Sequence, residues 1–600
     1  MRGSVFHSLL CSPLFVPTVA TNVAAALMFI ACSSTIGAMG CGSSGRAGFN
    51  NGSSTSGTDP NGSGLDGDGG PGFGNGGGGS GGNLNCLGLA SGTRSSAGCE
   101  YYAVVPDVIS DGAGACYAAF ITNTYKDPVS VTVDYGGQML DATKFAYIPN
   151  GQGQSLKYDP LPGGMIPAGQ VAILFLNRHA AGLPNPGLNL DCPTGVTPAI
   201  TASDAASHGT KLGHAFHIVT SAAVAAYDIY PFGGGQSAMT SATLLLPVTS
   251  WDTNYIAVDA LGPGPLDQPF IQIVGEVDGT QVTINPTADI VAGGASIPGT
   301  KKGSPQTYVV NRGQLLQFTQ DAELAGSVIE SSAPIGVWGG KTALAIKSCC
   351  DETAHQQIPP IRALGSEYTA VRYRNRYDGK EESPPWRLIG ALDGTTLTWE
   401  PSAPAGAPAT LSQGQVVQFD ASGPFVVKSQ DEKHPFYMSA HMTGAAELDP
   451  NMNDGRGDAE FVNVIPPGEF MTSYVFFTDP TYPETNLILT RTKGKDGAFA
   501  DVNLDCAGNV TGWAPVGTSG KYEFTRVDLV RHNFAPQGKC NNGRHEIHSA
   551  NPFGLTVWGW GSGETGAQFK GFFSQYVSYA YPGGANVQPI NDVVVPAHVK

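Results

Sequence analysis

One β-unit is written twice in this chain, across residues 270–344 and 386–443. Each copy has an early Asp-Gly-Thr, at Asp278–Thr280 and Asp393–Thr395, and then the pattern Gly-Gln, two aliphatic residues, Gln-Phe. Each copy closes with an apolar strand, a Ser-to-Pro corner and a second apolar strand. Three landmarks in the same order predict a duplicated structural unit, and Asp-Gly between apolar strands predicts a hairpin turn.

Weaker copies of the same landmarks flank the central pair. GQVAILFL followed by HIVTSAAVAAYD precedes them, and EIHSANPFGLTVWGWGS follows them. Short β-rich segments separated by turns, with almost no amphipathic helical pattern, predict an all-β fold. We expect tandem repeated β-units that are sandwich-like, with propeller-like radial packing as the alternative. The predicted units span 116–232, 251–345, 366–445 and 470–582, within a folded region of 84–600.

The amino-terminal residues predict export. Arg2 precedes an apolar stretch, 23–31, that is too short to cross a bilayer as a helix. Small residues precede both Cys32 and Cys41, as in a bacterial lipoprotein cleavage box, so residues 1–41 are interpreted as a lipoprotein or secretory signal. The lipid would be carried by one of these two cysteines. The expected location is the outer membrane or cell surface, with simple secretion as the alternative.

Residues 42–83 consist mainly of Gly, Ser, Asn and Asp. A segment with so little to bury cannot offset its ordering entropy, and it is predicted to be a flexible linker. The formal net charge of −17 gives no electrostatic basis for holding a phosphate backbone, which argues against nucleic acid as a partner.

The cysteines after the linker form an even set without CxxC spacing, which favours disulfides over zinc in an exported chain. A Cys506–Cys540 bridge and one bridge among the first four cysteines are expected, while the full connectivity stays open. The predicted disulfide cysteines are Cys86, Cys99, Cys116, Cys192, Cys349, Cys350, Cys506 and Cys540.

Several segments together resemble a known family. They are GHAFHIVTSAAVAAYDIYPF, SATLLLPVTSWDTNYIAV, IVGEVDGTQVTINP, GSVIESSAPIGVWGGKTAL, CCDETAHQQIPPIRALGSEYTAV and GRHEIHSANPFGLTVWGWGS. They resemble the IgGFc-binding protein amino-terminal domain family, and are most similar to its bacterial subgroup of myxobacterial-type predicted lipoproteins. The resemblance runs from about Cys99 to Gly584. It implies the fold and the location better than the function, because the Fc-binding activity does not carry over on these residues and the family supplies no ligand-binding residues to place on this chain.

One loop has the spacing of a calcium site. Asp449, Asn451, Asn453 and Glu460 stand at positions 1, 3, 5 and 12, which curls short oxygen ligands around one point. The sixth position is Asp454 where a glycine is expected, so an acidic solvated loop is the alternative. No cofactor other than this calcium is predicted. The same loop contains Arg456-Gly457-Asp458, an adhesive tripeptide.

Arg372, Arg374 and Arg376 alternate with aromatic residues. On a strand they would share one face and form a basic stripe that receives an anionic glycan or a partner's carboxylates. The alternative is a solvent-exposed face paired with local acids such as Glu381 and Glu382. Asp351, Glu352 and His355 form a further polar cluster, interpreted as a stapled loop with its charges in water.

No motif for a nucleophile, a phosphate loop or a zinc protease is present in the sequence. The first hypothesis is therefore a non-enzymatic cell-surface lipoprotein that binds an extracellular protein or glycan, with adhesion as its role. A secreted hydrolase, with carboxylates on the Asp449–Glu460 loop, is the second hypothesis. A structural envelope protein is the third.

Overall fold

The structure is a computed structural model of the chain, and it describes residues 94–179, 191–233, 239–261, 267–451, 453–566 and 574–598. The chain divides into two compact units, Met1–Gly69 and Gly70–Lys600, and all described residues belong to the second. The predicted signal, the linker, Cys32, Cys41 and Cys86 lie outside the described residues, as do the side chains of Cys349 and Cys350.

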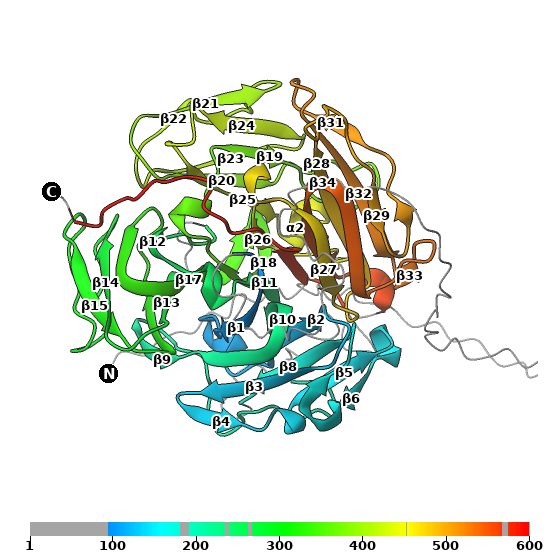
Figure 1. Cartoon of the computed structure of the whole chain (residues 1–600), viewed down its shortest axis with the longest axis horizontal. Coiled ribbons are helices and arrows are strands. Elements are labelled where there is room, and N and C mark those ends of the chain that lie inside the picture. Colours follow the sequence, from blue (N-terminus) through cyan, green and yellow to red (C-terminus); the bar gives the residue numbers. More distant parts are fainter. Residues whose placement is uncertain are drawn as a thin grey trace, which may run out of the picture. The chain divides into compact units, whose positions relative to one another are not determined.

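The all-β prediction is confirmed. In the described part the only α-helix is the single turn α2 (Ala445–Leu448), and all other regular elements are strands or 3-10 turns (Figure 1). All strand pairs between named strands are antiparallel.

The first group of strands forms a 10-stranded sheet. The bent strand β10 is its centre and pairs with β1, β2, β3 and β11. The 3-10 turns of this group are η1 (Ser110–Gly112), η2 (Ala142–Lys144), η3 (Gly153–Ser155) and η4 (Pro162–Gly164). Its strands are β1 (Ala97–Ala103), β2 (Tyr117–Asn123), β3 (Val129–Tyr135), β4 (Gln138–Leu140), β5 (Ala146–Asn150), β6 (Lys157–Pro160), β7 (Met165–Ile166), β8 (Val171–Asn177), β10 (Phe216–Tyr230) and β11 (Ser241–Leu245).

The second group forms an 8-stranded sheet around another bent strand, β17. The turns η5 (Val248–Ser250) and η6 (Ile361–Ala363) precede and follow this group. Its strands are β9 (Lys211–His214), β12 (Asp252–Ile256), β13 (Pro269–Gly275), β14 (Thr280–Asn285), β15 (Gln306–Val310), β16 (Gln314–Thr319), β17 (Val328–Ile346) and β18 (Ser348–Gln357).

The third group forms two 4-stranded sheets and ends at η7 (Pro467–Glu469). Its strands are β19 (Glu367–Ala370), β20 (Pro385–Gly390), β21 (Thr395–Glu400), β22 (Thr410–Leu411), β23 (Val416–Asp420), β24 (Phe425–Ser429), β25 (Phe436–Met442) and β26 (Glu460–Asn463).

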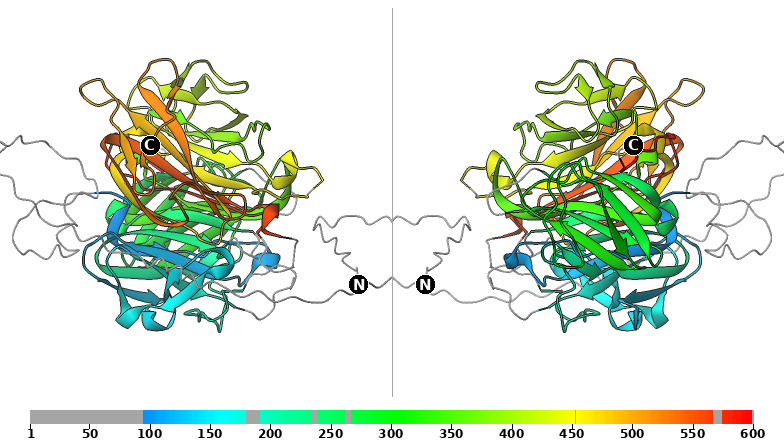
Figure 2. Two further views of the ribbon diagram at one scale, coloured as in Figure 1. Left: turned by 90° about the vertical axis from the view of Figure 1, so that its right-hand side faces the viewer. Right: turned by 90° about the vertical axis from the view of Figure 1, so that its left-hand side faces the viewer.

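The fourth group forms a 9-stranded sheet around the bent strand β34, with η8 (Gly563–Thr565) behind it. Its strands, orange and red in Figure 2, pack against the first group, because buried side chains of both groups form one hydrophobic core. Its strands are β27 (Met471–Thr478), β28 (Glu484–Thr492), β29 (Val502–Leu504), β30 (Gly508–Asn509), β31 (Ala514–Val516), β32 (Tyr522–Arg531), β33 (Ala535–Pro536), β34 (Gly543–Trp560) and β35 (Ser578–Pro582).

The two central copies of the sequence repeat fold alike. Both Gly-Gln segments lead into strands, β16 and β23, and these pair with the equivalent strands β13 and β20. At the two Asp-Gly turns, Gly279 and Gly394 both have φ 72°, which explains glycine there. The hairpin prediction is wrong, however, because β13 and β14 pair with two different stretches of β17 rather than with each other. The turn is a corner between two layers of a sandwich.

A buried tyrosine fixes the corner of every group, which lies within one bent strand in three groups and between β24 and β25 in the third. Its hydroxyl donates to a backbone carbonyl just after the corner: Tyr101 to Val224 (2.6 Å), Tyr255 to Ile335 (2.7 Å), Tyr368 to Phe436 (2.6 Å) and Tyr474 to Phe553. In the last three groups the same hydroxyl also accepts the N–H of the residue three positions earlier. Each tyrosine therefore joins the first strand of its group to the stretch of strand that follows the corner.

Replacing Tyr255 with phenylalanine is expected to lower the free energy of unfolding by about 1–3 kcal/mol, because a buried carbonyl and a buried N–H lose their partner. Denaturant unfolding measures this loss. Tyr125→Phe is the control, since Tyr125 lies in a surface loop after β2 and is only partly buried. Equal stability of the two variants would contradict the role of Tyr255.

One strand from each group lies in a ring at the centre of the molecule. β11 packs against β18 and β35, and β26 packs against the same two strands (Figure 1). Side-chain amides join the ring: Gln356 Nε2 lies 2.8 Å from the carbonyl oxygen of Ala242 and 3.2 Å from those of Phe461 and Ala580. Because loops at the ends of these strands meet around the ring, residues far apart in sequence are brought together there.

Candidate functional site

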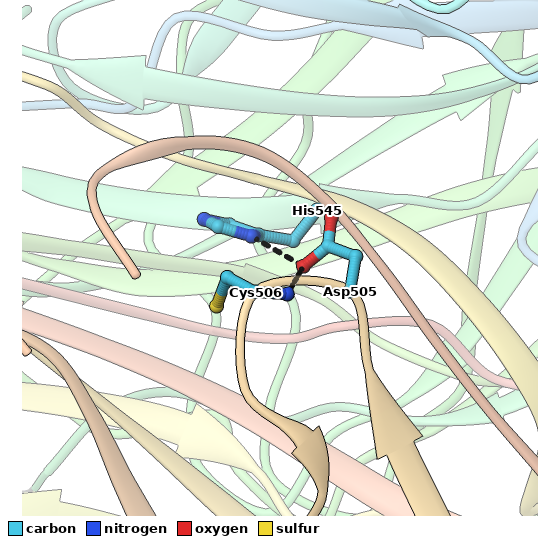
Figure 3. A group of neighbouring side chains, drawn as sticks. All are labelled: Asp505, Cys506 and His545. Atoms are coloured by element: carbon cyan, nitrogen blue, oxygen red, sulfur yellow. Dashed lines mark hydrogen bonds and ion pairs between the residues drawn. The ribbon is translucent and has the colours of Figure 1, made fainter. Parts of the chain in front are cut away.

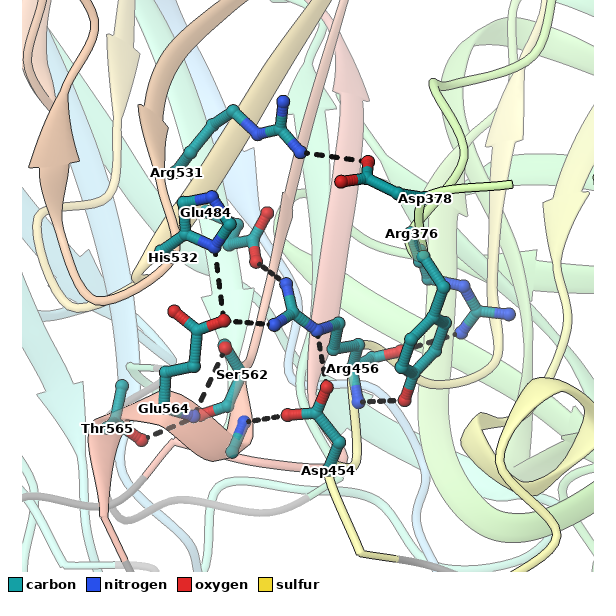
Figure 4. Close-up of polar contacts among 12 residues, drawn as sticks. Arg376, Asp378, Asp454, Arg456, Glu484, Arg531, His532, Ser562, Glu564 and Thr565 are labelled. Carbon is teal, nitrogen blue, oxygen red and sulfur yellow. Dashed lines mark hydrogen bonds and ion pairs between the residues drawn. The ribbon is translucent and has the colours of Figure 1, made fainter. Parts of the chain in front are cut away.

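The predicted calcium loop, the tripeptide and the arginine segment come together beside the central ring. Arg456 is paired with Asp454, Glu484 and Glu564 (Figure 4). Arg374 is paired with Glu484 and Asp528, and Arg376 with Glu382. We call these eight residues the arginine–carboxylate cluster. It joins the third group of strands to the fourth.

Arg456 is at the centre of the cluster. Its Nε donates to Asp454 Oδ2 (2.5 Å), its Nη1 to Glu484 Oε1 (2.5 Å) and its Nη2 to Glu564. The side chain of Arg456 is 10% exposed and that of Glu484 is not exposed at all. Arg374 also donates to Glu484, and it donates to Asp528 Oδ1 (2.7 Å) from the opposite side. Glu484 is therefore a buried carboxylate between two guanidinium groups.

Burial raises the pKa of Glu484, and the two arginines only partly offset that rise. Burial lowers the pKa of Arg456, but the facing carboxylates outweigh it and the net pKa is raised. Because a guanidinium does not lose its proton in a protein, we take the Arg456–Glu484 pair as ionised. Burial also raises the pKa of Glu564, but hydrogen bonds from His532 and Arg456 bring it below the ordinary value.

The prediction of an exposed arginine stripe is wrong. Arg372, Arg374 and Arg376 follow the end of β19 and lie outside any strand. Arg372 and Arg376 are buried, and Arg376 donates to Glu382, Thr443 and the carbonyl of Arg456. Arg374 pairs with acids distant in the sequence, Glu484 and Asp528. The pairing with local acids that the alternative named is confirmed for Arg376 and Glu382 (2.9 Å), but this pair is buried and does not face solvent.

The structure does not form the predicted calcium loop. Asp449 Oδ2 accepts the backbone N–H groups of Asn453 (2.7 Å) and Asp454 (2.8 Å), so it closes the turn itself. Glu460 is fully buried in β26, where it accepts from Ser241 Oγ (3.1 Å) and the Phe461 N–H (2.8 Å). Glu460, the calcium ligand expected at position 12, is therefore part of a ring strand and does not face the loop, while Asn451 and Asn453 are exposed.

The tripeptide is buried, since Arg456 is inside the cluster and Asp458 is fully buried. A smaller expectation also fails. Glu352 and His355 do not face water either, since both are buried in β18. His355 Nε2 lies 2.6 Å from Asp228 Oδ1, and Tyr117 donates to Asp228 Oδ2 (2.7 Å). These polar groups belong to the interior of the ring.

Asp505, Cys506 and His545 form the one group of three metal-type ligands in the described residues (Figure 3). Cys506, however, is bonded to Cys540, and a disulfide sulfur is not the thiolate that binds metal. His545 Nδ1 lies 2.9 Å from Asp505 Oδ1, and its Nε2 lies 2.7 Å from the carbonyl of Asn541. The group therefore braces a disulfide-closed turn.

The predicted disulfides are confirmed where the structure describes them. Cys506 pairs with Cys540, and Cys116 pairs with Cys192, which is a bridge among the first four cysteines. Cys99 is also disulfide-bonded.

The rim of the cluster is exposed. The side chain of Asp378 is 92% exposed and pairs with Arg531 (3.5 Å), and that of Glu381 is 69% exposed. Glu564 is 39% exposed and is held by both Arg456 and His532. We call Asp378, Glu381 and Glu564 the rim. These three acids lie at the exposed edge of the buried arginine–carboxylate cluster. Sequence reasoning missed Glu484, Asp528 and Glu564, because no local pattern links them to the arginines.

Within the described residues, the carboxylates of the loop that the hydrolase hypothesis named, and Glu484 beside them, are engaged in other contacts. Asp449 is used in its own turn, Glu460 is in the ring and Glu484 is enclosed by arginines. Among the described residues, no helix has the length and apolar character needed to cross a membrane.

Comparison with known proteins supplies the family. The model of the family described as "IgGFc binding protein" matches residues 241–559, more than half of the chain. The human "IgGFc-binding protein" is 22% identical over 297 residues, which cover 48% of this chain but 5% of that protein. No solved structure matches. The chain belongs to the IgGFc binding protein family.

Proposed function

We propose that this chain is a non-enzymatic binding protein at the cell surface, and that it binds a protein partner through the rim of the arginine–carboxylate cluster. The family is one of binding proteins and not a known enzyme family. The proposal includes the bacterial lipoprotein character: a lipid on Cys32 or Cys41 and the linker 42–83 would hold the folded region away from the membrane. Adhesion to an extracellular partner is the role that this layout serves.

One observation carries the proposal: a buried arginine, Arg456, holds the exposed acid Glu564 at the rim. Glu564 keeps 39% of its side chain exposed while Arg456 and His532 fix its carboxylate. A surface that is ordered before binding loses less conformational entropy when the partner arrives. Asp378, Glu381 and Glu564 make the rim acidic on a chain of net charge −17, so a partner with a basic patch is favoured over an anionic one.

The Fc fragment of immunoglobulin G is the first probe, because the human relative is named for binding it. Biosensor measurements with the purified protein would compare the wild type with Asp378→Lys/Glu381→Lys. We expect binding that weakens by about tenfold in the double variant, which corresponds to about 1.4 kcal/mol, and an association rate that falls as salt is added.

Asp159→Lys/Asp496→Lys is the matched control, since it reverses two exposed acids outside the cluster. The control is expected to bind as the wild type does. Retention of a glycan on an array, with no binding to Fc or to basic proteins, would contradict the protein-partner proposal and support the glycan alternative. Binding that ignores the rim variant would place the interface elsewhere.

A further inference from the structure

Lys341 is the one buried lysine among the described residues, with 2% of its surface exposed. It lies in β17 directly opposite Pro269 of β13, and Asp267 stands two residues before that proline. Lys341 Nζ is 2.8 Å from Asp267 Oδ2, and the side chain of Asp267 is 9% exposed. An amine and a carboxyl are therefore held in contact inside the protein, away from the arginine–carboxylate cluster.

A third acid, Asp351, interacts electrostatically with this pair. Asp351 is in β18, which runs beside β17. Burial raises the pKa of Asp351, the charge of Asp267 raises it further and the charge of Lys341 lowers it. The three groups therefore act on one another, and Asp351 keeps its proton more readily than an ordinary aspartate.

The surroundings do not suit a plain ion pair. A buried pair of charges loses its hydration, and good geometry with every polar atom satisfied is needed to recover that loss. Asp267 Oδ1 is buried without a hydrogen-bond partner in the described part of the chain. Amide formation needs the neutral amine and the carboxylic acid, and one proton transfer along the 2.8 Å contact between Lys341 Nζ and Asp267 Oδ2 supplies both.

We propose that Lys341 and Asp267 are joined by an intramolecular amide bond, formed with Asp351 as the proton carrier. A proton first passes from the Lys341 ammonium to the Asp267 carboxylate. The Nζ lone pair then attacks Cγ, the Nζ–Cγ bond forms and the Cγ–OH bond breaks. The protonated Asp351 accepts the second Nζ proton on its carbonyl oxygen and gives its own hydroxyl proton to the leaving hydroxyl, so that one water is released and nothing is oxidised or reduced.

The amine of Lys341 and the carboxyl of Asp267 are held in contact, and this allows the amide to form without chemical activation of the carboxyl group. Two groups held in the reacting geometry behave as though each were present at very high concentration. The product has no charge and one oxygen fewer, so it removes both buried ions. The bond would also fasten the start of β13 to β17, which suits a protein that is exposed outside the cell.

Tandem mass spectrometry of a tryptic digest of the reduced, alkylated protein tests the proposal. The expected product is a branched peptide that joins the segments around Asp267 and Lys341 and weighs one water less than their sum, with no cleavage after Lys341. Recovery of peptides cleaved after Lys341, with Asp267 unmodified, would overturn it.

Asp351→Asn tests the proton carrier separately. The variant is expected to fold, as judged by circular dichroism, yet to give the uncrosslinked peptides. Full crosslinking in Asp351→Asn would overturn the role of Asp351. In Lys341→Met the branched peptide is expected to disappear, which would confirm that it contains Lys341.

Discussion

Arg456→Met is expected to lower the free energy of unfolding by about 3–5 kcal/mol, because it removes one of two guanidinium groups from a carboxylate that has no contact with water. The side chain of Glu484 is 0% exposed, and of its two ion-pair partners, Arg374 and Arg456, only Arg374 would remain. The substitution also removes the ion pairs of Arg456 with Asp454 and Glu564. Chemical denaturation followed by circular dichroism measures the change.

Arg531→Met is the matched control, since it removes an arginine from the exposed side of the same region. Arg531 is 26% exposed and faces Asp378, which is 92% exposed. Exposed ion pairs contribute little, so this variant is expected to stay within about 1 kcal/mol of the wild type. Equal losses in the two variants would show that burial does not distinguish the pairs.

Glu469→Gln is expected to stabilise the protein above neutral pH and to flatten its pH dependence. Glu469 is buried at the end of η7, and its Oε2 accepts the backbone N–H of Gln588 (3.1 Å) from the carboxy-terminal segment. Burial raises the pKa of Glu469 from 4.5 to about 9, against the opposing effect of that hydrogen bond. The folded protein therefore holds a proton that the unfolded chain releases.

The sign of the effect follows from this difference in bound protons. Between about pH 5 and pH 9 the native state binds more protons at Glu469 than the unfolded state, so its contribution to stability falls as pH rises. The slope approaches 1.4 kcal/mol per pH unit in that window. The difference between wild type and Glu469→Gln isolates it from other titrating groups.

Denaturant unfolding at several pH values from 5 to 9 gives this difference directly, and Glu432→Gln serves as the control because Glu432 is exposed. The control is expected to change the free energy of unfolding by no more than about 0.5 kcal/mol. A constant difference between Glu469→Gln and wild type over this range would contradict the burial of a neutral carboxyl group.

Much of the fold was predictable because it rests on local patterns. The repeated Gly-Gln strands, the Asp-Gly turns and the Ser corners depend on neighbouring residues. Ser331 Oγ and Ser429 Oγ, for example, both donate to the carbonyl two positions ahead, at 2.7 and 3.1 Å. The corners are turn elements, as their repetition suggested. Local signals, however, did not distinguish a hairpin from a corner between layers, because that depends on which strand lies alongside.

The candidate site was less predictable because its contacts are long-range. Arg374 meets Glu484 and Asp528 across 110 and 154 positions of sequence. Nothing near Arg374 shows that these acids will neutralise it, so the alternating arginines were interpreted as a surface. The recurring tyrosines could have been noticed in the sequence. Tyr255, Tyr368 and Tyr474 each stand near the start of a group, and the hydroxyl of each accepts the backbone N–H of the residue three positions earlier.

The central claim is that buried ion pairs in the arginine–carboxylate cluster hold two groups of strands together and leave recognition to the exposed rim. A double-mutant cycle between Arg456→Met and Glu484→Gln, measured by denaturant unfolding, tests it most directly. A structural role predicts a coupling energy of about 2 kcal/mol or more between the two substitutions. Fc binding should weaken in folded Arg456→Met, which releases Glu564 of the rim. A coupling energy near zero would contradict the claim.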